Sequence, residues 1–147
     1  FTFISKTIIS GRRILKKTFK KGNIIVRQGD NKNKNLYILR KGRCSITRTA
    51  NNSILDCGKI YPGDIFGELS MILGLERSAT ILAIDDEVEV EELNKITFQE
   101  IIKKEPEIAW TVLTKLAIKT QMLDEIRGEM MHPDVIRTLI ENKKKGL

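Results

Sequence analysis

The segment from Phe66 to Thr80 carries residue types that suit a small phosphorylated sugar. The Glu68 carboxylate can accept hydrogen bonds from two adjacent hydroxyls. Arg77, nine residues later, offers a permanent positive charge and a planar fork of donors, which suits a phosphate. If both side chains face one cavity, they fit a ligand with a sugar diol and a phosphate. The same pair is equally consistent with a Glu–Arg salt bridge that pins a loop.

A short helix is expected within this segment. Residues Glu68 to Leu73 favour a single helical turn, and Gly67 in front of it permits a close approach of the backbone. The first N–H groups of a helix have no partner inside the helix and are therefore available to an anion.

The rest of the sequence does not favour catalysis or a metal centre. His132 is the one histidine, and no Cys/His cluster exists for it to join. P-loop and GxSxG patterns are absent, and Glu68 has no second carboxylate at a plausible catalytic spacing. We therefore expect no enzymatic activity, no metal and no cofactor.

Composition favours a cytoplasmic protein. The 147 residues include two cysteines, Cys44 and Cys57, without a CxxC pair, which indicates a reducing compartment rather than a disulfide scaffold. No apolar run is long enough to insert into a membrane, and no secretory signal is visible at the N-terminus.

The formal net charge of +7 is unevenly spread. A basic balance can indicate a nucleic acid or an anionic membrane as partner, but no aromatic residues interleave with the basic block near the N-terminus. We therefore interpret the charged blocks as solvated faces. They comprise a basic block (Arg12, Arg13, Lys16, Lys17, Lys20, Lys21), an acidic block (Asp85, Asp86, Glu87, Glu89, Glu91, Glu92) and a basic tail (Lys143–Lys145).

Short strands separated by turns are expected from about residue 14 to residue 94. Leu36–Leu39 and Cys44–Thr47 flank a Lys41-Gly42 turn, and Asn51-Asn52-Ser53 is a further turn signal. Val88–Glu91 alternates apolar and polar residues, which predicts a strand with one wet face. Strands of this length and spacing predict an antiparallel sandwich or jelly roll, that is, a double-stranded β-helix.

Helical spacing replaces this pattern after Asn94. A short helix is expected over Thr97–Lys104, and a longer one begins with Pro106 in its first turn and ends or bends at Gly128. A last short helix is expected over Pro133–Asn142. The chain is thus predicted to be one mainly β domain over 1–147, with a barrel at about 14–94 and C-terminal helices at about 96–142.

The run from Gly67-Glu68-Leu69 to Arg77-Ser78-Ala79-Thr80 resembles the phosphate-binding cassette of the cyclic nucleotide-binding domain family. This family includes the catabolite activator protein, protein kinase A regulatory subunits and cyclic-nucleotide-gated channels. The similarity covers roughly Ile14 to Arg127, including Gly29-Asp30, Leu36-Tyr37-Ile38 and Tyr61–Gly67.

The resemblance implies a role for each cassette residue. Glu68 would bind the ribose 2′-hydroxyl, with the Gly67 and Leu69 backbones close to the sugar. Arg77 would pair with the cyclic phosphate, to which Ser78 and Ala79 would add a hydroxyl and a backbone N–H. Ser70 completes the expected ligand-binding set. Serine at position 78, where cGMP-preferring members often have threonine, favours cAMP over cGMP.

The resemblance also implies that the long helix caps the base. By rough register, the capping residues would be Thr120, Leu123, Asp124 and Arg127. Leu123 is equally consistent with packing of the helix on the barrel.

We therefore expect a cyclic-nucleotide sensor domain, which couples ligand binding to movement of its C-terminal helices against an effector domain or protein. A homodimer through the long helix is possible. The alternatives are the sensing part of a catabolite-activator-like transcription regulator without its DNA-binding domain, and a ligand-free scaffold. Fourteen residues after Pro133 are too few for a helix-turn-helix, so we expect no sequence-specific nucleic acid binding by this chain alone.

Overall fold

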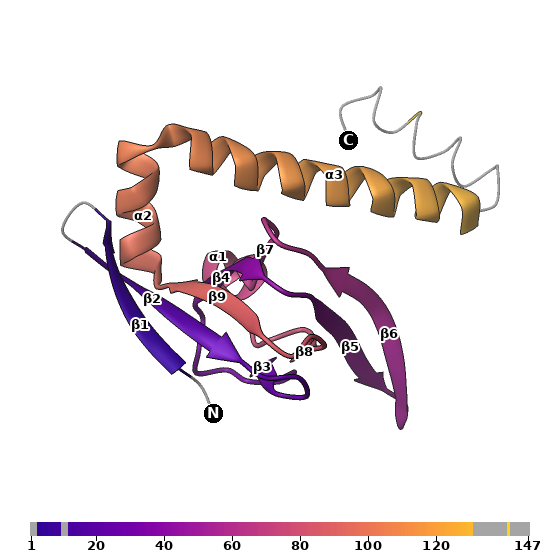
Figure 1. Ribbon diagram of the computed structural model, residues 1–147. Helices are drawn as coiled ribbons and strands as arrows, with labels where there is room; N and C mark the ends of the chain where they lie inside the picture. The colour runs from indigo at the N-terminus through magenta and orange to yellow at the C-terminus, as the bar shows by residue number, and fades with distance from the viewer. Residues whose placement is uncertain (1–2, 10–11, 131–140, 142–147) are drawn as a thin grey trace. The chain divides into compact units, whose positions relative to one another are not determined.

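Nine strands in the described part of the chain form two antiparallel sheets (Figure 1). The first sheet has the strand order β1-β2-β9-β4-β7, and the second has the order β3-β8-β5-β6. Their bounds are β1 (Phe3–Ile9), β2 (Arg12–Phe19), β3 (Ile24–Val26), β4 (Leu36–Lys41), β5 (Cys44–Ala50), β6 (Ser53–Ile60), β7 (Ile65–Phe66), β8 (Thr80–Ala83) and β9 (Val88–Leu93). The predicted antiparallel strands are confirmed, whereas β1 was not anticipated from the sequence.

The computed structural model describes residues 3–9, 12–130 and 141, and the side chains of residues 14–125 and 141. The chain divides into two units, Phe1–Lys104 and Glu105–Leu147. The first contains the strands, α1 (Glu68–Leu73) and α2 (Lys95–Lys104), and the second contains α3 (Pro106–Met130). A single domain over 1–147 stays a prediction.

Alternation along β4 divides the apolar side chains of the first unit between two clusters. Tyr37 and Leu39 join Phe66, Val88 and Val90 in the main core, which also contains side chains of the second sheet. Leu36 and the partly buried Ile38 belong to a second cluster, with Met71 of α1 and Phe98 and Ile101 of α2. Because side chains alternate across a strand, the second cluster lies on the other face of the first sheet and holds α1 there.

The turn predicted from Asn51-Asn52-Ser53 connects β5 and β6. Asn51 and Asn52 have φ values of 51° and 61°, in the left-handed region that asparagine tolerates better than most residues.

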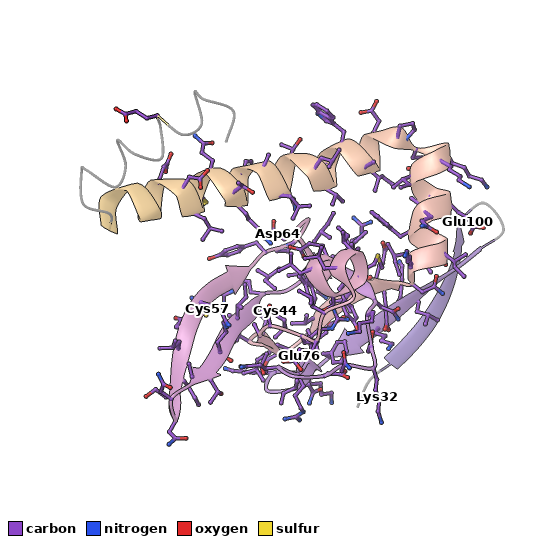
Figure 2. All side chains as sticks on the ribbon, turned by 180° about the vertical axis from the view of Figure 1, so that it is seen from behind. Lys32, Cys44, Cys57, Asp64, Glu76 and Glu100 are labelled. Carbon is purple, nitrogen blue, oxygen red and sulfur yellow. The ribbon has the colours of Figure 1, made fainter. Side chains whose placement is uncertain are left out.

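The cysteines are both free thiols, Cys44 buried on β5 and Cys57 exposed on β6 (Figure 2). Burial raises the pKa of the Cys44 thiol to about 12.

The acidic block is only in part a solvated face, which corrects the interpretation from the sequence: Asp86 and Glu87 are exposed, whereas Glu91 and Glu92 are buried. Five of its residues pair with cations of neighbouring strands and turns: Lys16–Glu89 (3.8 Å), Lys17–Glu92, Arg40–Glu91 (2.8 Å), Lys41–Glu87 (3.1 Å) and Arg43–Asp85 (2.8 Å). Glu91 and Glu92 are buried, so the predicted wet face of β9 is also wrong. The reason is that β9 lies between β2 and β4, both of which carry Lys or Arg.

The two described helices after the barrel begin close to their predicted positions. α2 ends at Lys104, and Pro106 opens α3 as expected. α3 continues through Gly128 to Met130, so an end at Gly128 is wrong; one glycine costs a helix only about 1 kcal/mol. Apart from Glu141, the predicted helix over Pro133–Asn142 lies outside the described residues. Among described residues, no helix is both long and apolar enough to cross a membrane.

Candidate functional site

The predicted helical turn is α1, and Gly67 in front of it has a left-handed backbone with φ 82°. A Cβ at Gly67 would lie 2.8 Å from Nη1 of Arg77 and 2.8 Å from the carbonyl oxygen of Asn35. Any other residue here would therefore be strained and would collide with both neighbours. The glycine thus allows the start of α1 to lie directly against Arg77.

Arg77 is 3% exposed, and its guanidinium is held by three hydrogen bonds. Nη1 donates to the carbonyl oxygen of Gly67 (3.1 Å), while Nη2 donates to the carbonyl oxygen of Asn35 (2.7 Å) and to Oδ1 of Asn33 (3.3 Å). The guanidinium also lies 5.7 Å from the centroid of the Tyr37 ring, within the range of a cation–π contact.

The segment from Gly29 to Asn35 clamps the loop that carries Arg77. The Gly29 N–H donates to the Arg77 carbonyl (2.8 Å), and the Arg77 N–H donates to the Asp30 carbonyl (2.9 Å). Nζ of Lys34 donates to the carbonyls of Gly74 (3.0 Å) and Leu75 (2.7 Å). The loop before β8 is therefore fixed by hydrogen bonds at Arg77 itself and at Gly74 and Leu75, which precede it.

Glu68 and Ser70 are buried at 6% and 3% exposure, so α1 turns both toward the protein interior. Burial lowers the pKa of Arg77, and the charges of Asp30, Glu92 and Glu68 oppose this shift. The site thus keeps a buried guanidinium charged among surrounding carboxylates. The hydrogen bonds that hold Arg77 itself end on backbone and amide oxygens.

The other cassette residues lie nearer the surface. Ser78 is exposed and Ala79 half-buried, and both precede β8. Leu69 is also exposed, together with Ile72, Leu73 and Leu75 of the same segment.

The expected capping residues belong to the second unit. Thr120, Leu123 and Asp124 are exposed on α3, and the Thr120 hydroxyl donates to the carbonyl of Leu116 (2.9 Å). Arg127 lies on α3, but its side chain is outside the described ones. Their capping role stays a prediction.

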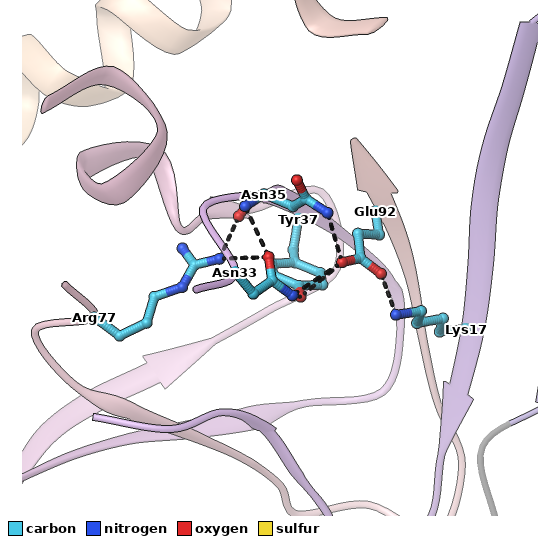
Figure 3. A network of polar contacts seen from close by, with 6 residues as sticks. All are labelled: Lys17, Asn33, Asn35, Tyr37, Arg77 and Glu92. Carbon is cyan, nitrogen blue, oxygen red and sulfur yellow. Dashed lines mark hydrogen bonds and ion pairs between the residues drawn. The ribbon is translucent and has the colours of Figure 1, made fainter. Parts of the chain in front are cut away.

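A polar network behind Arg77 was not predicted from the sequence (Figure 3). We call it the Glu92 network; it consists of Lys17, Asn33, Asn35, Tyr37, Arg77 and Glu92. One feature of the sequence could have indicated this network. Glu91 and Glu92 are consecutive on one strand, so their side chains point to opposite faces of the sheet and one of them must face the core.

The Glu92 carboxylate is the centre of this network. Its Oε1 accepts hydrogen bonds from Asn33 (3.1 Å), Asn35 (2.9 Å) and the Tyr37 hydroxyl (3.1 Å), and its Oε2 pairs with Lys17. Burial raises the pKa of Glu92, but the Lys17 and Asn35 contacts outweigh this effect and leave the pKa below its usual value of 4.5. Glu92 is therefore an ionised, buried carboxylate.

Among the described residues, no group of His, Cys, Asp and Glu is arranged to hold a metal ion. Arg77 and Glu68 are a buried cation and a buried acidic residue, and the exposed Ser78 carries a hydroxyl next to Arg77 in sequence.

The family model of the cyclic nucleotide-binding domain matches residues 16–105, which include both Glu68 and Arg77. The cAMP-dependent protein kinase regulatory subunit of Candida albicans is 33% identical over 84 residues, which are 57% of this chain and 17% of that protein. Its counterpart in Dictyostelium discoideum is 35% identical over 85 residues, which are 57% of this chain and 25% of that protein.

Among solved structures, the Thermus thermophilus catabolite activator protein has a TM-score of 0.69 and 27% identity. The match covers 76% of this chain and 52% of that one. It confirms the predicted antiparallel jelly roll followed by helices. The matches thus span no more than about half the length of these relatives.

We predict that Lys17→Met destabilises the fold far more than Lys16→Met. Loss of Lys17 leaves the Glu92 carboxylate buried without its cation, at a cost of about 2–4 kcal/mol at pH 7. Lys16 pairs with the half-buried Glu89 at 3.8 Å, so its loss should cost less than about 1 kcal/mol. Urea unfolding of both variants measures the difference.

The difference in unfolding free energy between wild type and Lys17→Met should depend on pH. Because folding lowers the pKa of Glu92, its contribution is present above pH 4.5 and is lost as the pH falls through the lowered pKa. The gap between wild type and Lys17→Met should therefore narrow below about pH 4.5. Equal losses in the two variants at pH 7, or a gap independent of pH, would contradict this description of Glu92.

Proposed function

Because the chain belongs to the cyclic nucleotide-binding domain family, we propose that it binds a 3′,5′-cyclic nucleotide, with cAMP preferred over cGMP, at α1 and the Arg77 loop. The observation that carries the proposal is the contact between the start of α1 and Arg77. The carbonyl of Gly67 accepts a hydrogen bond from the Arg77 guanidinium. Glu68, the next residue after Gly67, is buried.

In the proposed complex, Arg77 binds the cyclic phosphate. A guanidinium has five N–H donors, and the three hydrogen bonds described above leave part of this set for a ligand. Because Arg77 is 3% exposed, the phosphate must replace some of the protein packing around it. The Ser78 hydroxyl and the Ala79 N–H supply further donors, and Glu68 accepts the ribose 2′-hydroxyl.

The role we propose is regulatory rather than catalytic. Ligand binding shifts the helices that follow the barrel toward an arrangement that covers the nucleotide, and thereby changes what those helices contact. Exposed apolar side chains on both units support such coupling: Leu69, Ile72, Leu73 and Leu75 on the first, and Trp110, Leu113, Ile118, Met122 and Leu123 on the second. An effector, or a further domain as in a transcription regulator, would receive the signal.

The ribose assignment predicts how 2′-deoxy-cAMP behaves. A hydrogen bond to the charged Glu68 is worth about 1.5–3 kcal/mol, so 2′-deoxy-cAMP should bind the wild type about 10- to 150-fold more weakly than cAMP. In Glu68→Ala the two ligands should bind almost equally. Titration calorimetry at fixed ionic strength measures both ratios.

Glu76→Ala is the matched control for Glu68→Ala, because Glu76 is an exposed carboxylate of the loop between α1 and β8 that also carries Arg77 (Figure 2). It should keep the wild-type ratio. Equal binding of the two ligands to the wild type would show that Glu68 does not contact the ribose, and absence of heat with millimolar cAMP or cGMP would favour a ligand-free scaffold.

The serine at position 78 predicts a modest preference for cAMP. One hydroxyl-level contact is worth about 0.5–1.5 kcal/mol, so cAMP should bind about 2- to 12-fold more tightly than cGMP. Ser78→Thr should reduce this ratio, since threonine often occupies the position in cGMP-preferring members. Competition binding tests this, and a tenfold preference for cGMP in the wild type would contradict it.

A further inference from the structure

The Glu92 network connects Arg77 to a buried carboxylate that lies behind it. Asn33 and Asn35 stand between the two groups, and both contact each of them (Figure 3). Glu92 belongs to β9, whereas Arg77 precedes β8 of the other sheet. The two amide residues therefore join the two sheets at the candidate site.

The orientation of the Asn33 amide is determined by Glu92. Its Nδ2 donates to Oε1 of Glu92 (3.1 Å) and to the Tyr37 hydroxyl (2.9 Å). An amide has donors on one side only, so its Oδ1 must face the opposite way. There Oδ1 accepts from Nη2 of Arg77 (3.3 Å) and from the Asn35 N–H (2.9 Å).

Asn35 provides the second connection. Its side-chain Nδ2 donates to Oε1 of Glu92 (2.9 Å), while its backbone carbonyl accepts from Nη2 of Arg77 (2.7 Å). The position of that carbonyl is further held by the Asn33–Asn35 hydrogen bond. Both acceptors of Nη2 are thus fixed by groups that Glu92 holds.

Only a carboxylate satisfies this arrangement. Glu92 accepts from Asn33, Asn35, Tyr37 and Lys17, and all four are donors. A glutamine that kept its oxygen toward Asn33, Asn35 and Tyr37 would place its NH₂ group against the Lys17 ammonium. Repulsion between these two donors should displace the side chain and thereby disturb the two amides and, through them, the guanidinium.

We propose that Glu92 is a positioning residue for Arg77, acting through Asn33 and Asn35 to set the guanidinium for an anionic ligand that Glu92 does not touch. The inference rests on the proposed function for the identity of that ligand. The positioning of Arg77 can be measured without any ligand. The claim that Glu92 positions Arg77 and the claim that the chain binds a cyclic nucleotide can therefore be refuted independently.

The first test is the order of the Arg77 side chain in the ligand-free chain. Nitrogen-15 relaxation of the Arg77 Nε–H should report an ordered group in the wild type and a more mobile one in Glu92→Gln. Glu89→Gln is the control, because Glu89 lies on the same strand and pairs with Lys16 outside the network. Unchanged order in Glu92→Gln would overturn the proposal.

The second test is a double-mutant cycle on the Kd for cAMP. Glu92→Gln should weaken binding about 5- to 30-fold, the effect of one or two misplaced hydrogen bonds, and Glu89→Gln should leave it unchanged. In an Arg77→Ala background, Glu92→Gln should have no further effect. An equal effect in both backgrounds would show that Glu92 supports the fold in general, which overturns positioning through Arg77.

A second pair of variants keeps the test valid if Glu92→Gln does not fold. Asn33→Ala removes one connection from the half-buried network, and Lys32→Ala alters an exposed residue of the same segment. Asn33→Ala should reproduce the loss of Arg77 order and Lys32→Ala should not; equal order in the two would overturn the proposal. If the wild type does not bind cAMP, the proposed function fails, and the relaxation measurement alone decides the positioning role.

Discussion

The Arg77 guanidinium is buried at 3% exposure and rests on two backbone carbonyls and one amide oxygen. A cation in this position is tolerated only if acceptors and compensating charges surround it. Gly67 supplies one carbonyl because it lacks a Cβ, and the Asn33–Asn35 segment supplies the other acceptors. Burial of one cation thus requires a left-handed glycine, a clamped loop and a second polar layer.

The charge distribution of the chain follows from the same requirement. Acidic residues of β9 lie between the cations of β2 and β4, so that the three glutamates of the acidic block on this strand are paired within the barrel. Glu92 is ionised in the core because Lys17 stands on one side and three neutral donors on the other. Each of these pairs is neutral, so their cations have a structural role and do not contribute to the net charge of +7.

Local patterns allowed much of the fold to be predicted. The β5–β6 turn, the α1 turn and the start of α3 depend on residues that are neighbours in sequence, such as Asn51-Asn52 and Pro106. The Glu92 network could not be predicted in this way, because Asn33 and Glu92 are 59 residues apart and meet only through sheet pairing. For the same reason Arg77 was expected to face a ligand or Glu68, whereas its described hydrogen bonds end on Gly67, Asn33 and Asn35.

The central claim is that this buried guanidinium is the phosphate-binding group. A crystal structure of the chain with cAMP tests it most directly. We expect hydrogen bonds from the Arg77 guanidinium to the exocyclic phosphate oxygens, with the Asn35 carbonyl still accepting from Nη2. A complex in which the phosphate is bound elsewhere, with Arg77 still donating to Gly67, Asn33 and Asn35 alone, would contradict it.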